Sequence, residues 1–424
     1  MMKIMVVGGG GREHAIIKSL KKNDRVTEIF ALPGNGGIAA DATCVPIGAK
    51  DIENIVKFAT ENKIDFAVVA PDDPLVLGAV DALNAVGIPC FGPKANAAII
   101  EGSKVFSKNL MKKYGIPTAA YEVFTEMEAA LAYLENAPIP TVIKADGLAL
   151  GKGVIIAQTR DEAKEAVHSM MEDKIFGASG SQIVIEEFLT GPEVSVLSFT
   201  DGNVVIPMIS SMDHKRAHDN DEGLNTGGMG TIAPNPYYTD AVAAECMETI
   251  FLPTIKAMKA EGREFRGCLY FGLMITPDGP KVIEYNCRFG DPETQVVLPL
   301  LESDLLTIME ATANGTLAET EVKFSEKSAC CVIVASEGYP TAYKKGFEIT
   351  LPAAETDKEI FVAGAKLGAN GELLSDGGRV LGVTAVAENL EKAIERAYVH
   401  TKKVHMDNSF YRNDIGQRAL KALK

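Results

Sequence analysis

The chain has 424 residues, and several features that would assign it to other protein classes are missing. No apolar run approaches the roughly 18 residues needed to span a membrane, and the apolar stretch at the start is too short for a signal peptide. The seven cysteines include no C-x-x-C pair, which argues against a zinc or disulfide framework. Acidic residues outnumber basic ones by 57 to 42, and a net charge of −15 argues against a general nucleic-acid binder. These absences predict a cytoplasmic protein with reduced thiols that needs neither a membrane nor a nucleic acid.

The length suggests about three domains of roughly 150 residues each. Residues 1–92 alternate apolar strands with helical spacing, which predicts a parallel sheet covered by helices on both faces. Two of the expected helices are Leu75–Val86 and Asp240–Ala260. We divide the chain into an α/β domain at 1–103, a second region at 104–325 with a mobile lobe at about 120–190, and a small β-rich domain at 326–424.

The stretch "MKIMVVGGGGREHA", residues 2–15, resembles the start of a dinucleotide-binding domain. The G-x-G-x-x-G/A fingerprint fails, however, because Glu13 occupies its third position and no acidic residue ends the next strand. Backbone N–H groups at a helix start still attract anions, so a sugar phosphate is favoured here over a tight turn without ligand.

Two segments suggest a nucleotide site. In "TVIKADGLALGKGV", residues 141–154, a buried strand carries Lys144 and a glycine-rich turn with Lys152 follows. Lysines beside such a loop can hold nucleotide phosphates, although strand-end lysines are usually solvated. In "IVIEEFLTGPEVSV", residues 183–196, three glutamates surround a strand and a turn, and an acidic hairpin edge is the default interpretation.

A third segment, "KVIEYNCRFGDPETQ", occupies residues 281–295. Val282, Glu284 and Asn286 alternate, so all three are expected on one face of a strand. A carboxylate and an amide oxygen on one face suit Mg²⁺, which prefers oxygen ligands together with phosphate oxygens. An exposed strand edge is the competing interpretation.

A fourth segment, "DHKRAHDNDEGLNTGGMGTIAP" at residues 213–234, is rich in charge and glycine and carries Lys215, Arg216 and Asn225. A loop this long is more often a functional lid than plain surface.

Together these motifs resemble the glycinamide ribonucleotide synthetase family, ATP-grasp enzymes of purine biosynthesis. The resemblance covers essentially the whole chain. It is carried by "GGGGREHA", "GPKANAAIIEGSK", "IKADGLALGKGV", "DHKR" with "NTGGMG", "RFGDPETQ", "GGRVLGVTA" and "FYRNDIGQRAL". It implies an N-terminal doubly wound parallel-sheet domain for substrate, an ATP-grasp module whose central lobe closes over ATP, and a C-terminal domain.

The resemblance also implies an activity: glycine joins 5-phosphoribosylamine through glycyl phosphate, with ATP becoming ADP and phosphate and with Mg²⁺ or Mn²⁺ as metal. A monomer is implied by resemblance. The one residue that departs from the family pattern is His218, where a small or apolar residue is expected. Alternatives that stay open are another ATP-grasp carboxylate–amine ligase, a dinucleotide-dependent oxidoreductase and a non-catalytic nucleotide sensor.

The resemblance implies these site residues. ATP contacts are expected from Lys104, Lys144, Glu186, Glu187, Phe188, Leu189, Glu193, Arg216 and Asn225. Metal ligands are expected to be Glu284 and Asn286. Catalytic roles are expected for Lys144, Arg288 and Asp291. Substrate contacts are expected from Gly10, Gly11, Asn35, Asp73, Arg288, Gly290 and Asp291.

Overall fold

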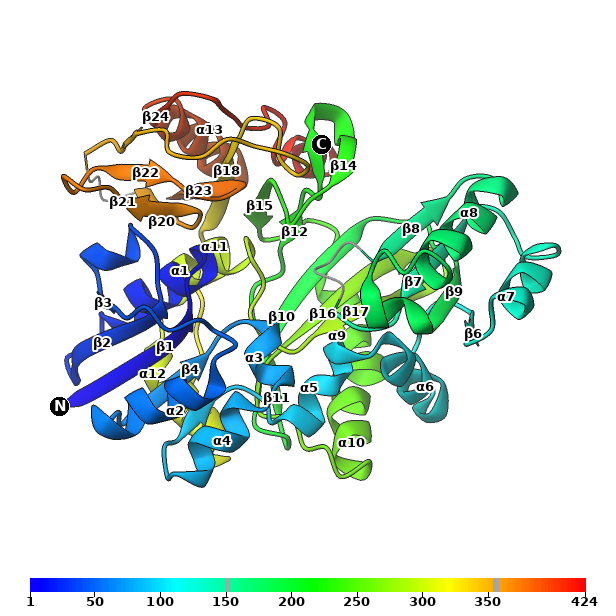
Figure 1. The fold of residues 1–424 in the computed structure, drawn as a ribbon, viewed down its shortest axis with the longest axis horizontal. Helices are drawn as coiled ribbons and strands as arrows, with labels where there is room; N and C mark the ends of the chain where they lie inside the picture. The colour runs from blue at the N-terminus through cyan, green and yellow to red at the C-terminus, as the bar shows by residue number, and fades with distance from the viewer. Residues whose placement is uncertain (149–152, 354–357) are drawn as a thin grey trace.

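The computed structural model describes residues 1–148, 153–353 and 358–424. Figure 1 shows three parts: the N-terminal sheet at lower left, the C-terminal sheet above it, and a lobe that projects to the right from the central sheet. The fold class expected from the sequence is confirmed. Lys152, expected in the glycine-rich turn, lies outside the described residues.

The N-terminal sheet is parallel, in the order β3-β2-β1-β4-β5. Its central strand is buried on both faces: Ile4 and Val6 pack into one core, and Met5 and Val7 into another. Such a strand has a continuous apolar run, which the sequence shows. The strands are β1 (Met2–Gly8), β2 (Val26–Pro33), β3 (Thr43–Cys44), β4 (Phe66–Val69) and β5 (Cys90–Phe91), and the helices are α1 (Gly11–Leu20), α2 (Ile52–Glu61), α3 (Asp72–Val76) and α4 (Ala79–Ala85).

Two helix predictions need correction. The helix expected at Leu75–Val86 is interrupted, because Gly78 takes a left-handed conformation with φ of +87°. The helix expected at Asp240–Ala260 contains a π-helical turn at Met247–Phe251 between α9 (Asp240–Cys246) and α10 (Leu252–Ala260).

The lobe is a four-stranded sheet in the order β6-β9-β7-β8 with two helices. It has a core of its own, built from residues between Phe124 and Ile185. Its elements are β6 (Tyr121–Phe124), α7 (Met127–Leu134), β7 (Thr141–Ala145), β8 (Val154–Ala157), α8 (Arg160–Met171) and β9 (Ile183–Glu187).

The central sheet is antiparallel, in the order β11-β10-β16-β17, and it meets the lobe at the end of β9. Its elements and the helices beside them are α5 (Ala95–Gly102), α6 (Lys104–Tyr114), β10 (Glu193–Thr200), β11 (Val205–Pro207), β16 (Gly267–Thr276), β17 (Gly279–Asn286), α11 (Thr294–Val297) and α12 (Leu305–Asn314).

The C-terminal sheet includes two strands from earlier in the chain. β12 (Met212–Asp213) pairs with β15 (Gly230–Ala233), and β15 pairs with β18 (Ser328–Ser336). Between β12 and β15 a hairpin is formed by β13 (Arg216–His218) and β14 (Glu222–Asn225). The remaining elements are β19 (Ile349–Thr350), β20 (Lys358–Val362), β21 (Ala365–Leu367), β22 (Leu373–Ser375), β23 (Arg379–Ala387), α13 (Leu390–Thr401), β24 (His405–Met406), β25 (Ser409–Phe410) and α14 (Gln417–Ala422). Among the described residues, no helix is both long and apolar enough to cross a membrane.

Candidate active site

A buried ion cluster lies where the lobe meets the central sheet. Glu186 on β9 receives two lysines at one carboxylate oxygen: Lys144 Nζ at 3.0 Å and Lys108 Nζ at 3.1 Å. Lys144 also donates to the carbonyl of Ile283 on the central sheet at 3.2 Å, so it bridges lobe and body. The acidic hairpin edge expected here is wrong for Glu186, because that carboxylate is only 4% exposed and is paired.

The second lysine, Lys108, is buried. Burial lowers its pKa to about 8, against the pull of Glu186. Its partner Glu186 keeps one buried carboxylate oxygen without a hydrogen bond to the described residues. A buried acceptor without a partner is costly, so this oxygen is placed to meet a ligand donor.

The start of α6 forms a second contact between body and lobe. Ser103 caps the helix, and its hydroxyl donates to Asp146 at 3.1 Å. Lys104 Nζ donates to the carbonyl of Gly147 at 2.7 Å. Burial lowers the pKa of Lys104, and Glu284 acts in the opposite direction. Lys104 and Lys144 therefore bring two positive charges to the same junction.

The segment after β9 connects the lobe to the central sheet. Glu187 is exposed and accepts the backbone N–H of Ala120 at 3.3 Å, whereas Phe188 and Leu189 are half-buried. Glu193 begins β10 with its side chain about half exposed, 3.7 Å from Lys215 Nζ.

The two expected metal ligands, Glu284 and Asn286, lie on the same face of β17. Glu284 is opposite Gly272 and Asn286 is opposite Tyr270 in the pairing with β16. The expectation that Val282 shares this face is wrong, because a bulge at this point makes Val282 pair with Leu273 in the apolar core.

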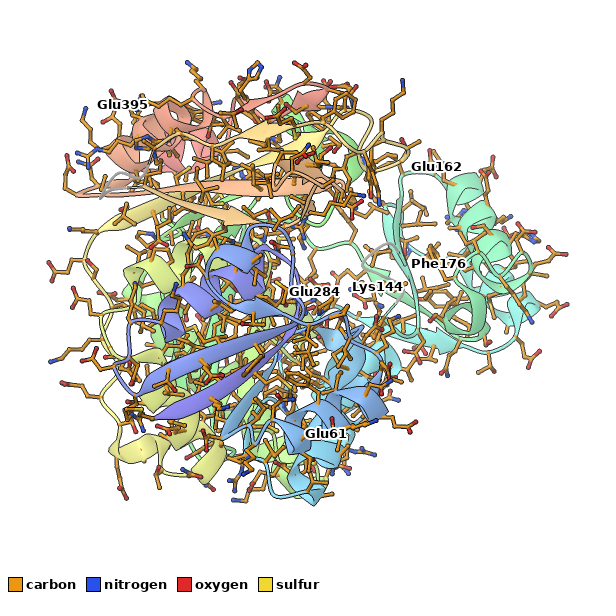
Figure 2. The ribbon with its side chains drawn as sticks, turned by 60° about the vertical axis from the view of Figure 1, so that its left-hand side comes forward. Glu61, Lys144, Glu162, Phe176, Glu284 and Glu395 are labelled. Atoms are coloured by element: carbon orange, nitrogen blue, oxygen red, sulfur yellow. The ribbon has the colours of Figure 1, made fainter. Side chains whose placement is uncertain are left out.

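The charge of Glu284 is stabilised from several sides. Lys215 Nζ lies 3.6 Å from its carboxylate, and Lys215, Lys144 and Lys104 together lower the pKa of Glu284. Figure 2 shows Lys144 and Glu284 close together where lobe and body meet. An ionised carboxylate beside an amide oxygen fits a hard divalent cation that is completed by phosphate oxygens.

Arg288 extends the site beyond the metal pair. Its Nη2 donates to Asn286 Oδ1 at 3.1 Å and lies 2.8 Å from Glu101 Oε1. Its Nε is buried and has no partner among the described residues. Asp72 acts on the pKa of both Glu101 and Arg288, so its charge lies near them.

Asp291 is fixed by groups from the N-terminal domain, from α11 and from the C-terminal domain. Its carboxylate accepts the backbone N–H of Arg12 at 3.3 Å and Gln295 Nε2 at 2.9 Å, and Arg379 Nη1 lies 3.4 Å away. Burial acts to raise the pKa of Asp291, but Arg379 and Arg12 outweigh it, so the pKa is lowered. Gly290 leaves room for Glu293, whose carboxylate oxygen would lie 2.2 Å from an added Cβ.

The glycine loop, whose N–H groups are expected to face a phosphate, is approached by two carboxylates of this chain. Glu13, 1% exposed, accepts the N–H of Gly10 at 2.6 Å and Arg12 Nε at 2.7 Å. The N–H of Arg12, the second residue of α1, is taken by Asp291 at 3.3 Å. The start of α1 therefore already holds two carboxylates of this chain. Gly11 packs against Gln295, which would lie 2.6 Å from an added Cβ.

A cavity of about 420 Å³ lies beside this loop, between the N-terminal and C-terminal domains. Gly9 and Asn35 line it from one side, and Lys366 and Asp376 from the other. The Asn35 side chain is used within the protein: it donates to the carbonyls of Gly9 and Val362 and accepts two backbone N–H groups.

Three of the expected substrate residues, Gly10, Gly11 and Asp73, do not line this cavity. Gly10 and Gly11 are absent from its wall, and Asp73 is ion-paired to Lys50 at 2.8 Å.

Arg216 and Asn225 are brought together, since they pair across the base of the β13–β14 hairpin, and Arg216 Nη1 donates to the carbonyl of Gly223 at 2.8 Å.

Sequence reasoning missed three residues of the site. Lys108 lies four positions after Lys104 on α6, a helical spacing that was available as a signal. Lys215 was noted in its motif but given no role. Arg379 lies in the "GGRVLGVTA" motif but was given no role, because its partner Asp291 is distant in the chain.

Comparisons with known proteins agree with this geometry. Residues 2–101 match the N domain, 102–294 the ATP-grasp (A) domain and 329–418 the C domain of phosphoribosylglycinamide synthetase. Fold and site thus define an ATP-grasp enzyme, a class that binds ATP with a divalent metal ion.

Relatives give the family. Phosphoribosylamine–glycine ligase of Caldanaerobacter subterraneus subsp. tengcongensis is 48% identical over 416 residues, 98% of this chain and 99% of the relative. The Salmonella typhimurium enzyme of that name is 48% identical over 424 residues, 99% of each chain. The crystal structure of phosphoribosylamine–glycine ligase from Thermotoga maritima has a TM-score of 0.85 at 34% identity, and covers 97% of this chain and 100% of its own. The chain belongs to the phosphoribosylamine–glycine ligase family.

The fold extends further than the family. The biotin carboxylase domain of Hydrogenobacter thermophilus 2-oxoglutarate carboxylase, solved with MgADP, has a TM-score of 0.74 at 17% identity, and covers 97% of this chain and 92% of its own. At that identity the likeness concerns the fold alone.

Proposed function

We propose that this chain joins glycine to phosphoribosylamine in purine biosynthesis, consuming ATP and producing glycinamide ribonucleotide, ADP and phosphate. The observation that carries the proposal is the junction where Lys104 and Lys144 face Glu284 and Asn286, with Arg288 and Asp291 directly beyond. Membership of the family supports the choice of substrates.

The chemistry explains why such a junction suffices. A carboxylate does not acylate an amine at a useful rate, because oxide is a very poor leaving group. The glycine carboxylate attacks the γ-phosphoryl group of ATP and becomes glycyl phosphate, with ADP released. The amine of phosphoribosylamine then attacks the acyl carbon and phosphate leaves. Both steps need positioning, charge neutralisation and exclusion of water rather than a protein nucleophile.

The nucleotide site follows from the lysine cluster. Lys104 and Lys144 hold the ATP phosphates, supported by their place at the junction of lobe and body. Residues 186–189 contact adenine, and Glu193 accepts the ribose hydroxyls. Arg216 and Asn225 approach the phosphates from the β13–β14 hairpin.

Glu284 and Asn286 would hold Mg²⁺ or Mn²⁺. Bound there, the metal neutralises charge on the phosphate oxygens. The shared strand face of the two oxygen ligands and the lowered pKa of Glu284 support this assignment.

Arg288, Gly290 and Asp291 form the glycine and acyl-phosphate site. The buried Nε–H of Arg288, beside Asn286, has no partner among the described residues. It can therefore donate a hydrogen bond to a carboxylate or phosphate oxygen of a substrate. Asp291 stays ionised because of Arg379 and Arg12, and it can receive an ammonium group.

Phosphoribosylamine is assigned to the pocket of Gly10, Gly11, Asn35 and Asp73, with its phosphate near the glycine loop, and the 420 Å³ cavity beside this loop supports the assignment. Gly9 and Asn35 bound the cavity, and Lys366, 3.5 Å from the carboxylate of Asp376, places a positive charge in its wall.

Three coarser expectations accompany the proposal. We propose domains at 1–103, 104–325 and 326–424, a monomeric enzyme and a cytoplasmic location. Sedimentation of the purified chain tests the monomer, and cell fractionation tests the location.

The decisive experiment supplies ATP, Mg²⁺ and glycine, with phosphoribosylamine formed in place from ribose 5-phosphate and ammonia. Mass spectrometry then detects glycinamide ribonucleotide, and a coupled assay follows ADP. A product that requires all three substrates is the expected result. ADP with a different acid or amine would keep the ATP-grasp chemistry and overturn the substrates, and absence of turnover would favour a nucleotide sensor.

A further inference from the structure

The β13–β14 hairpin, residues 216–225, is a poorly covered element that carries two proposed ATP contacts. All four residues of β14 are exposed. Asn220 and Asp221 at the turn both have positive φ, 61° and 55°, which is strained for residues other than glycine. Strained, exposed backbone persists only when surrounding contacts over-determine it, so the source of those contacts matters.

The contacts come from the far end of the chain. Arg412, only 1% exposed, donates Nη1 to Asp221 Oδ1 at 3.0 Å and to the carbonyl of Arg216 at 3.1 Å. Its Nε and Nη2 form a two-pronged pair with Asp414, both at 2.8 Å. Asp414 in turn accepts the backbone N–H of Asn220 at 2.9 Å.

Further contacts repeat this pattern. Asn413 donates its backbone N–H and its Nδ2 to the two oxygens of Asp219, at 2.7 and 3.0 Å. The rings of His218 and Phe410 lie 5.6 Å apart. Figure 1 shows the chain end beside β14. His218, the residue that departs from the family pattern, is thus part of this contact.

We propose that residues 410–418, the C-terminal latch, hold the hairpin over the nucleotide cleft, and that Arg412 is the positioning residue for Arg216 and Asn225. The path is short: Arg412 holds the carbonyl of Arg216, Arg216 pairs with Asn225, and the preceding Lys215 reaches Glu284 at 3.6 Å. The inference rests on the proposed ATP contacts of Arg216 and Asn225. It gives the C-terminal motif a role in the proposed activity although the motif lies outside the ATP-grasp domain.

The test compares two latch variants with a matched control. Arg412→Lys keeps the charge but loses the planar fork, and Asp219→Ala removes the hairpin side of the Asn413 contact without touching a buried arginine. Arg25→Ala is the control, because Arg25 forms a similar two-bond pair with Glu310 (3.2 and 2.6 Å) away from the hairpin. Each is measured for KM of ATP and of glycine, affinity for MgATP by calorimetry, and melting temperature.

Both latch variants are expected to raise the KM and Kd of ATP about tenfold, with the KM of glycine at the parent value and a melting temperature like that of the control. Asp219→Ala keeps the test available if Arg412→Lys does not fold. Parent affinity for ATP in a folded latch variant would overturn the proposal. Equal losses for both substrates with a melting temperature below the control would also overturn it, since that indicates a structural role only.

One more variant separates this inference from the proposed function. If Arg216→Ala weakens ATP binding and Arg412→Lys does not, the latch is wrong and the ATP role of the hairpin stands. If Arg216→Ala leaves ATP binding unchanged, the proposed ATP contact of Arg216 is wrong, and the positioning role of Arg412 is wrong with it.

Discussion

The lobe and the region around Asp291, which lie on two sides of the proposed nucleotide site, are held in place differently. The lobe packs around its own core and meets the body mainly through polar contacts, at Lys144 and at the 146–147 turn. The region around Asp291 is tied to Arg12 of the N-terminal domain and Arg379 of the C-terminal domain. We therefore expect the lobe to move as a unit when it grips ATP, while the acyl site keeps its geometry.

The largest effect is expected for Glu284→Gln, which changes a proposed metal ligand on the body side of the site. The change preserves shape but removes the charge that three lysines stabilise, so kcat should fall by about a thousandfold while the melting temperature stays near the parent value. Steady-state kinetics over a Mg²⁺ titration measure it, with Glu122→Gln on the exposed face of the lobe as control. Normal turnover with intact metal dependence would contradict the metal assignment.

Acid should affect the two regions unequally, because of His214. Burial, with Arg412 and Arg418, lowers its pKa to about 4, and the neutral ring accepts the N–H of Gly416 at 3.1 Å. The unfolded chain binds this proton near pH 6.5 and the folded chain only near pH 4. Stability is therefore full above pH 6.5 and falls between these values, by about 3 kcal/mol at one pKa unit per 1.36 kcal/mol.

Hydrogen exchange between pH 7 and pH 4.5 measures this effect. Protection should fall first around β15 and residues 410–418, before it falls in the lobe core. Earlier loss of protection in the lobe core would contradict the predicted effect of His214.

Arg379→Ala should loosen the region around Asp291. Asp291 loses a charge that lowers its pKa, so the acid limb of the kcat profile should move to higher pH and kcat at pH 7 should fall by about thirtyfold. A pH–rate profile checks the direction in which the acid limb moves. Lys392→Ala, at an exposed position of α13, is the control. A profile identical to the parent would remove Arg379 from the site.

Lys144→Ala addresses the lobe and should have the smallest effect. Lys108 remains to pair with Glu186, so the fold survives while ATP affinity weakens by about tenfold. Calorimetry with MgATP measures it, with the exposed Lys112→Ala as control. Unchanged affinity would count against Lys144 as a phosphate contact.

Much of the fold was available from local pattern. The alternation of apolar strands and helical spacing in residues 1–92 predicted a parallel sheet, and this is confirmed; its central strand is apolar throughout Ile4–Val7 because it is covered on both faces. The helix at Leu75–Val86 was wrong, since periodicity does not register a single glycine that turns left-handed. Val282 was placed on the wrong face because alternation assumes a strand without a bulge.

The candidate site divides in the same way. Motif order identified Lys144 and Glu284, and their roles stay predictions that the kinetics above test. The interpretation of the glycine loop as a phosphate site also stays a prediction, and the structure adds that Glu13 reaches back to the amide of Gly10.

The sequence by itself determined the family, the order of the domains and the chemical types at the cleft, because these depend on residue type and spacing along the chain. Only the tertiary structure decided which charges meet: Arg379 with Asp291, Lys108 with Glu186, and Arg412 with the 216–225 hairpin. These pairs are set by packing between distant segments, and long-range packing leaves no local period to read.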